Sequence, residues 1–198
     1  MYCNRYSSKT NIVIVLSKRL FDFIFSLIIL LFLSGFLLFF YILASLQSRS
    51  NGLYFQQRIG QYGKTFTIFK LKSMHDTSQK VTPFGTWMRK HKLDELPQFF
   101  NVLIGNMSIV GPRPDIEGYY DKLEGEDRKI LELKPGITSI ASLKYYNEET
   151  ILEQQENPLF YNDTVIFPDK VKMNLDYFYH QSFWLDVKII WKTIQELN

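Results

Sequence analysis

The sequence predicts an α/β fold of the α+β kind: a compact domain with a small antiparallel sheet and surrounding interfacial helices, preceded by a helical hairpin that re-enters a membrane. Three observations predict it. Residues 23–46 form an apolar run without a charged side chain, residues 53–72 contain two strand-like runs, and helix-like patterns follow. The expected parts are a basic segment at residues 1–19, a re-entrant membrane helix at 20–47 and a cytoplasmic domain at 48–198.

The composition supports a single folded domain beside the apolar run. With 198 residues, of which 46% are hydrophobic and 16% aromatic, the chain can bury one core but hardly two, and disorder is not expected. The single cysteine, Cys3, excludes an internal disulfide framework and suits a reducing compartment.

Charge is distributed unevenly along the chain. Residues 1–92 hold 13 Lys and Arg but 2 acidic residues, whereas residues 93–198 hold 10 Lys and Arg and 18 acidic residues. A basic region favours an anionic partner. Because these basic residues flank the apolar run, anionic lipid head groups and phosphate-bearing substrates fit better than nucleic acid. A plain solubilising charge bias is the alternative.

The apolar run is long enough to cross a membrane. As a straight helix its 24 residues measure about 36 Å, against a hydrocarbon core of about 30 Å, and the run is too long for a cleaved signal peptide. Basic residues lie on both sides, so both ends are expected in the cytoplasm. Ser34 and Gly35 lie at its middle, where a Gly/Ser pair can kink a helix. We therefore expect a re-entrant helix bent at this pair, with a plain transmembrane helix as the open alternative.

Residues 53–58 and 64–72 are rich in aromatic and β-branched side chains, and the glycine-bearing turn between them predicts a β-hairpin. Gly63-Lys64-Thr65 imitates the end of a phosphate-binding P-loop. That loop would need a glycine where Arg58 stands and a long helix afterwards, so an ATPase is rejected.

Two short helices are expected in the middle of the chain. Thr82, followed by proline, predicts the start of a helix that runs to Lys90. Asp94 is expected to cap a second helix that runs through Ile104 and ends at Gly105.

The last third of the chain is less regular. The acid-rich residues 115–133 are predicted to be helical, and residues 145–167 are predicted mostly as loop, a candidate specificity element. Four apolar residues at helical spacing predict an amphipathic C-terminal helix: Trp184, Val187, Trp191 and Ile194. Its stripe suits a membrane interface and the domain core about equally well.

The adjacent acids Asp94 and Glu95 are the candidate catalytic residues, because so few acidic residues precede them. Acids at a helix start are often only partners of the helix dipole, so a role in chemistry needs anion-binding groups nearby. A diphosphate substrate would join both kinds of group, since Mg²⁺ binds carboxylate and phosphate oxygens while cations grip the remaining phosphate oxygens. Asp94 is expected to stay ionised and to serve as a phosphoryl acceptor. The candidate phosphate-binding residues are Arg89, Arg113 and Lys72, with Lys70 on the same strand face as Lys72.

Several ordered motifs carry a resemblance to a known family. The run RKHKLDELPQFFNVL at residues 89–103, continued by GNMSIVGPRP at 105–114, closely resembles the signature of the bacterial sugar transferase family, the monotopic phosphoglycosyl transferases. The similarity extends to KRLFD at 18–22, FQQRIG at 55–60, FKLKSM at 69–74, KPGIT at 134–138 and SFWLD at 182–186. It covers nearly the whole chain from Lys18.

The resemblance implies a two-step reaction on the cytoplasmic face of the bacterial inner membrane. Asp94 matches the nucleophile and a Mg²⁺ ligand, and Glu95 matches its dyad partner. Asp94 would attack a UDP-sugar and release UMP, and undecaprenyl phosphate would then take the sugar phosphate from the enzyme. Arg89, Arg113 and Lys72 match positions around the phosphates. The implied partners are the UDP-sugar donor, undecaprenyl phosphate and membrane lipids, with Mg²⁺ as cofactor and no nucleic acid.

The sequence departs from the family pattern at three places. Gly35 follows Ser34 where proline is common, Asn106 replaces a common aspartate, and Ser139 stands where glycine is frequent. The third departure leaves donor preference open. Larger relatives carry extra N-terminal membrane helices and a further domain, so the expectation here is the minimal catalytic form.

Three other readings stay open on the sequence. The first is an inactive membrane scaffold with the same fold, the second a membrane-attached nucleic-acid binder, and the third a glycosyltransferase that releases UDP instead of UMP. Family resemblance suggests initiation of capsule, exopolysaccharide, O-antigen or glycoprotein glycan assembly without choosing among them. The donor sugar and the oligomeric state, a homo-oligomer included, are left open.

Overall fold

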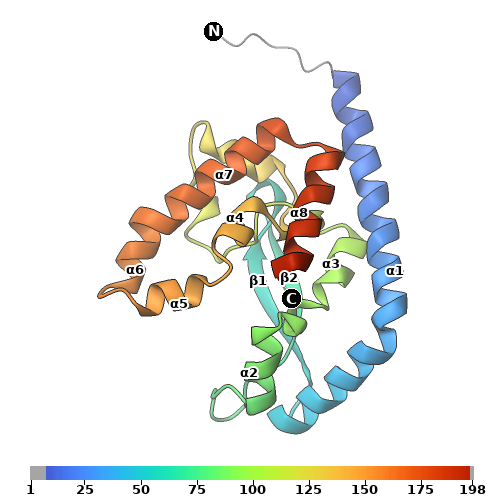
Figure 1. Cartoon of the computed structure of the whole chain (residues 1–198), viewed down its shortest axis with the longest axis vertical. Coiled ribbons are helices and arrows are strands. Elements are labelled where there is room, and N and C mark those ends of the chain that lie inside the picture. Colours follow the sequence, from blue (N-terminus) through green and yellow to red (C-terminus); the bar gives the residue numbers. More distant parts are fainter. Residues whose placement is uncertain (1–7, 197–198) are drawn as a thin grey trace.

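The computed structural model describes residues 8–196, and their side chains from residue 16 onward. Cys3 and the other residues of the expected basic segment up to residue 7 lie outside the described residues. Figure 1 shows a long N-terminal helix along one side of a helix-rich domain that contains a β-hairpin. The elements are α1 (Ser8–Ser48), β1 (Leu53–Ile59), β2 (Thr65–Leu71), α2 (Pro83–Lys90), α3 (Gln98–Ile104), β3 (Ser108–Val110), β4 (Gly136–Thr138), α4 (Ile140–Lys144), α5 (Glu148–Glu153), α6 (Pro158–Tyr161), α7 (Phe167–His180) and α8 (Phe183–Glu196).

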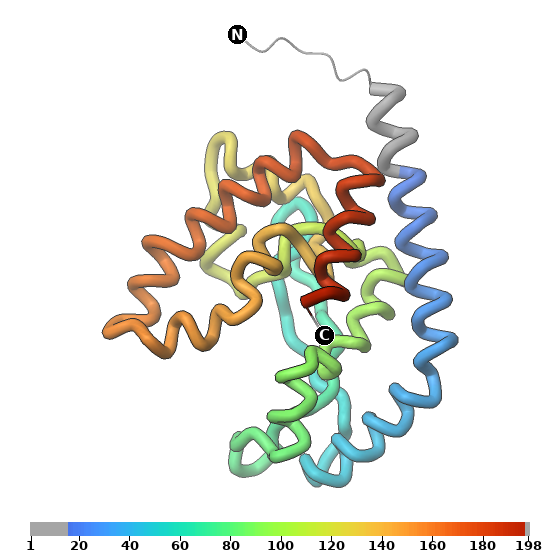
Figure 2. The backbone as a smooth tube through the Cα atoms, in the orientation of Figure 1, coloured from blue at the N-terminus to red at the C-terminus, as the bar shows by residue number. Residues whose placement is uncertain are grey.

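Helix α1 is bent near its middle, as Figure 2 shows. Its halves, Leu16–Phe32 and Ser34–Ser48, meet at 65°. Among the described residues no single straight helix has the length and hydropathy to cross a membrane, whereas these two halves pass that test together. At the bend, the Ser34 Oγ donates to the Leu31 carbonyl oxygen at 2.9 Å. A Cβ at Gly35 would meet nothing within 4 Å, so packing does not require the glycine.

Arg19 and Asp22 attach α1 to the domain through polar contacts. Arg19 donates to the carbonyl oxygens of Val102 and Leu103 at 2.6 and 2.8 Å. A side chain of α1 thus donates to carbonyl groups in the last turn of α3, of which that of Val102 also accepts from the Gly105 N–H at 3.0 Å. Asp22 is buried and accepts from the backbone N–H of Ile109 at 3.1 Å. These bonds fix α1 against α3 and β3.

A second clamp joins α1 to the C-terminal helices. The Lys18 ammonium forms an ion pair with Asp186 of α8 and donates to the Tyr177 hydroxyl of α7 at 3.2 Å. The Tyr177 hydroxyl donates in turn to Asp186 at 2.6 Å. Because Tyr177 and Asp186 are buried, loss of Lys18 would leave the Asp186 carboxylate without its cation.

The predicted β-hairpin is confirmed. β1 and β2 pair antiparallel, from Leu53 opposite Leu71 to Ile59 opposite Thr65. Asn101 of α3 is fully buried against β2, where its Oδ1 accepts from the Phe69 N–H at 3.0 Å and its Nδ2 donates to the Thr67 carbonyl oxygen at 2.7 Å. The Asn101 amide thus takes the place of a third strand and fixes α3 relative to β2.

Asn101→Leu is expected to lower the free energy of unfolding by about 2–4 kcal/mol, because it leaves a backbone N–H and a carbonyl group of β2 buried without partners. Denaturant midpoints of the full chain in detergent micelles measure this. Asn106→Leu is the matched control, since the Asn106 side chain is exposed. Equal midpoints for the two variants would contradict the role given to Asn101.

A second, parallel pair of strands was not predicted. Ser108 pairs with Gly136 and Val110 with Thr138. The start of β4 and the residue that follows β3 lie so close together that a Cβ on Gly136 would be 2.2 Å from the Gly111 backbone nitrogen. The Gly136 N–H donates to the Pro112 carbonyl oxygen at 2.8 Å. This close approach requires glycine and holds the loop at residues 111–114 in place.

The boundaries predicted for the two short helices are confirmed in part. The Thr82 hydroxyl oxygen accepts from the Gly85 N–H at 2.9 Å, and α2 runs to Lys90 as expected. Gly105 ends α3 with a φ of 95°. Asp94, however, does not cap α3, because Pro97 stands at the N-cap and the residues before it form a separate turn.

The prediction of a helix over residues 115–133 is wrong. The segment contains two 3₁₀ turns, Tyr120–Lys122 and Asp127–Glu132. Gly118 and Gly125 take positive φ values of 105° and 56°, which interrupt the helical pattern.

The prediction of loop over residues 145–167 is also wrong. Helices α5 and α6 lie there, and a π-helical turn at Asn162–Ile166 leads into α7. Asn157 caps α6 by accepting from the Phe160 N–H at 3.1 Å. These helices of six and four residues bury no side chain, so no apolar period marks them in the sequence.

Candidate active site

Asp94 and Glu95 lie in a single 3₁₀ turn, Leu93–Glu95, between α2 and α3. Lys92 takes a φ of 55°, in the left-handed region, and so reverses the chain after α2. Proline at position 97 then starts the next helix. The sequence thus produces a tight turn that presents two adjacent carboxylates beside β2.

Glu95 is held by two cations. The Lys70 ammonium of β2 donates to Oε1 at 3.0 Å, and the Arg113 guanidinium binds both carboxylate oxygens, with Nη1 at 3.0 Å from Oε2. Burial raises the pKa of Glu95, but the charges of Arg113 and Lys70 outweigh it and hold that pKa well below its ordinary value. Glu95 therefore stays ionised and organises two cations from different parts of the chain.

Asp94 is in a different electrostatic state from its neighbour. Its side chain is buried, at 8% exposure. Burial, and then the charge of Glu95, raise the pKa of Asp94, while the charges of Lys70 and Arg89 oppose that shift. The environment therefore gives the two acids different properties. Glu95 is an ionised carboxylate paired with two cations, and Asp94 is a buried carboxylate with a raised pKa.

The structure brings only some of the predicted phosphate-binding residues to the acids. Arg113 contacts Glu95, and Arg89 lies close enough for its charge to lower the pKa of Asp94 while its Nε donates to the Ser73 Oγ at 2.8 Å. Lys72 hydrogen-bonds Asp76 at 2.9 Å. Its role in phosphate binding stays a prediction.

Lys70, rather than Lys72, reaches the acid pair. Lys70 lies within β2, whereas Lys72 follows the strand, which ends at Leu71. Alternation along a strand groups both lysines on one face, but it does not reveal where the strand ends. The contact between Lys70 and Glu95 depends on the packing of β2 against α3, which sequence spacing does not encode.

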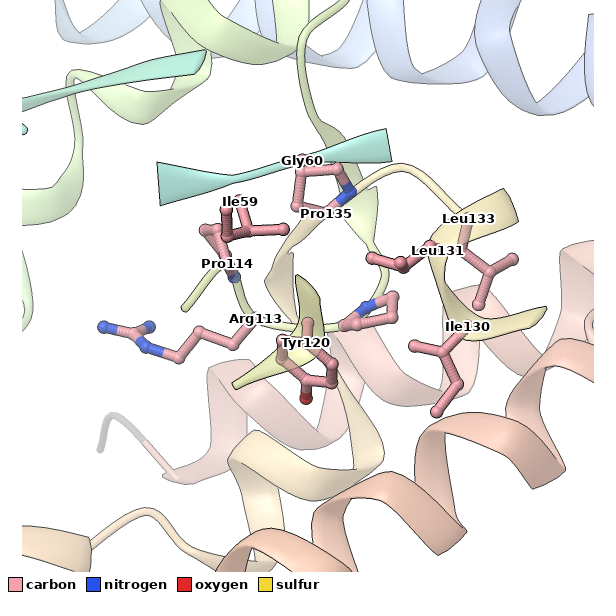
Figure 3. A pocket seen from close by; sticks show the side chains of 10 residues that line it. Ile59, Gly60, Arg113, Pro114, Tyr120, Ile130, Leu131, Leu133 and Pro135 are labelled. Atoms are coloured by element: carbon pink, nitrogen blue, oxygen red, sulfur yellow. The ribbon is translucent and has the colours of Figure 1, made fainter. Parts of the chain in front are cut away.

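A small apolar pocket lies behind the loop that carries Arg113 (Figure 3). It offers about 20 Å³, room for roughly one water molecule, and side chains such as Tyr120, Ile130 and Leu131 line it. The Arg113 side chain extends away from these groups, as Figure 3 shows. The Arg113 guanidinium therefore lies away from the pocket and contacts Glu95.

The carboxylates fit a Mg²⁺ site only in company with a substrate. The described residues contain no group of three or more His, Cys, Asp or Glu side chains placed to hold a metal ion. Mg²⁺ is commonly held by one or two carboxylates together with substrate phosphates and water. Because Lys70 and Arg113 engage Glu95, Asp94 is the protein ligand that the described site offers.

Large apolar side chains are exposed on helices that surround the site. Along α1 they recur on the side turned away from the domain, as at Leu31 and Phe32, which are 67% and 84% exposed. Trp184 and Trp191 of α8 are 77% and 61% exposed, and Trp87 of α2 is also exposed. Exposed apolar side chains gathered on one side of a helix are typical of a surface that contacts lipid or protein.

Comparison with known proteins identifies relatives over most of the chain. The family model described as bacterial sugar transferase matches residues 13–198. The UDP-glucose:undecaprenyl-phosphate glucose-1-phosphate transferase of Klebsiella pneumoniae is 34% identical, over 96% of this chain and 42% of the relative. The UDP-N-acetylgalactosamine-undecaprenyl-phosphate N-acetylgalactosaminephosphotransferase of Aeromonas hydrophila is 32% identical, over 79% and 37%. A relative from Caulobacter vibrioides has the same name as the Klebsiella protein. It is 30% identical, over 94% of this chain and 72% of the relative. The chain thus spans less than half the length of the first two relatives, and their names differ in the sugar.

Proposed function

Because the chain belongs to the bacterial sugar transferase family, as its motifs predicted, we propose that it moves a sugar 1-phosphate from a UDP-sugar to undecaprenyl phosphate. The names of its relatives support this reaction class. The observation on this chain that supports it is the different state of the two acids. Asp94 is buried and has a raised pKa, while Glu95 forms ion pairs with Lys70 and Arg113 beside it.

The proposed reaction has two displacements at one phosphorus atom. A carboxylate oxygen of Asp94 attacks the sugar-proximal phosphorus of the donor, the bond to the bridging oxygen breaks, and UMP leaves with that oxygen. A phosphate oxygen of undecaprenyl phosphate then attacks the same phosphorus and releases Asp94, which gives undecaprenyl diphosphate sugar. Glu95 positions Lys70 and Arg113, whose charges stabilise the phosphate oxygens in both steps.

Asp94 would also hold Mg²⁺ together with oxygens of the bound diphosphate. Such an ion supplies positive charge at the transferred phosphate and so favours attack by an anionic carboxylate. The positive charge of Arg89, close to Asp94, adds to this effect by favouring the ionised form of Asp94.

We place the protein on the cytoplasmic face of the inner membrane, with α1 re-entrant and α8 at the interface. The 65° bend of α1, its exposed apolar side and the exposed tryptophans of α8 support this placement. It lets one active site receive a water-soluble donor and a lipid acceptor.

The single cysteine permits a direct test of topology. A re-entrant α1 keeps Cys3 on the cytoplasmic side with the catalytic domain, so a membrane-impermeant maleimide should label Cys3 in inverted membrane vesicles but not in intact spheroplasts. A Cys3→Ser, Ser78→Cys variant marks the side of the domain. Labelling of Cys3 and of the domain cysteine from opposite sides would show that α1 spans the membrane.

The proposed reaction is tested by product analysis. The full chain in nanodiscs is incubated with Mg²⁺, undecaprenyl phosphate and each of a panel of UDP-sugars, including UDP-glucose and UDP-N-acetylgalactosamine, and the nucleotide product is identified. Release of more than one equivalent of UMP per enzyme that depends on the lipid supports the proposal and identifies the donor. Release of UDP would establish a glycosyltransferase, and no release from any donor by folded protein would favour the inactive scaffold.

A further inference from the structure

Arg58 lies on the same face of the β-hairpin as the lysine that contacts Glu95. In the antiparallel register Lys70 is opposite Tyr54, and Arg58 follows Tyr54 by four residues, so Lys70 and Arg58 point to one side. At the end of β1, the Ile59 N–H donates to the Asp115 carbonyl oxygen at 2.9 Å. This bond joins β1 to the loop that carries Arg113 and brings the two arginines together.

The guanidinium of Arg58 is poorly satisfied by the protein. Its Nη2 donates to Gln56 at 2.8 Å, and its Nη1 is 3.8 Å from the Asp115 carboxylate, which is long for a hydrogen bond. Within the described part of the chain, its buried Nε has no hydrogen-bond partner. Only 19% of the Arg58 side chain is exposed, so water does not easily compensate.

Arg58 shares its buried surroundings with a second guanidinium group, that of Arg113. Burial lowers the pKa of Arg58 most, and the charge of Arg113 adds to that shift, while the charges of Asp115 and Glu95 oppose it. Buried guanidinium groups are ordinarily paired and fully hydrogen-bonded. An anion bound beside Arg58 would supply an acceptor for the unpartnered Nε.

We propose that Arg58 is a binding residue for the diphosphate of the donor and that it completes, with Lys70 and Arg113, a cationic cradle beside the two acids. This inference rests on the proposed function for the identity of the donor. A guanidinium offers N–H groups in a fork that matches phosphate oxygens, and Arg58 has an Nε that is free to donate. Asp115 holds Arg58 weakly, at 3.8 Å, and competes with the phosphate for it.

The rival role of Arg58 is structural: it would only tie β1 to the Asp115 loop. The two roles differ in what Asp115→Asn does. If Arg58 binds phosphate, removing the competing carboxylate leaves anion affinity unchanged or raises it. If Arg58 acts only through Asp115, Asp115→Asn has the same effects as Arg58→Gln.

Binding of inorganic pyrophosphate and of UDP to the full chain in nanodiscs, measured calorimetrically with Mg²⁺ and without turnover, tests the proposal. Arg58→Gln is expected to weaken both by about 10- to 100-fold, the usual effect of losing charge-assisted hydrogen bonds, and Arg58→Lys is expected to restore part of the affinity. Asp115→Asn is expected to bind both anions at least as well as the wild type. Melting temperatures report any loss of structure.

The outcomes separate this inference from the proposed function. Weaker binding of pyrophosphate in Arg58→Gln alone supports the cradle even if no UDP-sugar is turned over. Equal affinity of Arg58→Gln and wild type overturns the inference while UMP release by the wild type leaves the function standing. Equal weakening in Arg58→Gln and Asp115→Asn, with equal falls in melting temperature, overturns it in favour of the structural role, as does a wild type that binds neither anion.

Discussion

Asp94→Asn is expected to reduce UMP release by at least about a thousandfold, because an amide oxygen cannot replace the carboxylate as nucleophile. The substitution keeps the size of the side chain, and an amide oxygen can still accept the backbone hydrogen bond that the Asp94 carboxylate accepts within the turn. The fold should therefore survive. Product release under saturating donor and acceptor measures the loss.

The same variant tests the covalent intermediate. Mass spectrometry of wild-type protein quenched after mixing with donor alone should show an added sugar phosphate, and Asp94→Asn should show none. Asp176→Asn, an exposed change on α7, is the control that should keep full activity and the adduct. An adduct on Asp94→Asn, or activity close to wild type, would assign the nucleophile elsewhere.

Glu95→Gln is expected to reduce activity by about a hundredfold, because it leaves Lys70 and Arg113 without their shared carboxylate. It should also move the acid limb of the pH profile. Asp94 must be ionised to attack, and its pKa is raised. As the pH is lowered, the wild-type rate should therefore begin to fall at a higher pH than it would for an ordinary aspartate. Glu95 raises that pKa through its charge, so Glu95→Gln should shift the limb to lower pH.

Lys70→Met is the matched control for the sign of this shift. The charge of Lys70 lowers the pKa of Asp94, so its removal should move the acid limb to higher pH. Profiles of kcat/KM against pH for the wild type and both variants measure the effect. A limb that stays in place in both variants would mean that a group other than Asp94 controls it.

Local sequence signals identified much of the fold. The Thr82 cap, the glycine at 105 and the alternating runs of the hairpin are decided by contacts within a few residues, so their chemistry is readable from the sequence. The parallel pairing of β3 and β4 was missed because it joins strands of three residues across a long connection. Strands so short carry almost no periodic signal.

The candidate site shows the same division. Asp94 and Glu95 are adjacent in the sequence, and their motif pointed to them directly. The cations around them come from α2, β1, β2 and the loop after β3, and only packing decides which of Lys70 and Lys72 reaches Glu95. Arg58 lies in the FQQRIG motif at residues 55–60, but the motif did not indicate that the Arg58 guanidinium is buried near Arg113.

The Arg19 contacts have a consequence for how this protein can be divided. Arg19 belongs to the helix proposed to enter the lipid, yet it donates to carbonyl oxygens in the last turn of α3, the helix that directly follows the two acids. α1 is thus part of the framework that holds α3 beside the candidate site and not a detachable segment. Replacing α1 by an unrelated membrane helix would restore attachment to the bilayer but not the hydrogen bonds that Arg19 donates to the last turn of α3. Such a chimaera should reach the membrane and still lack a well-ordered catalytic centre.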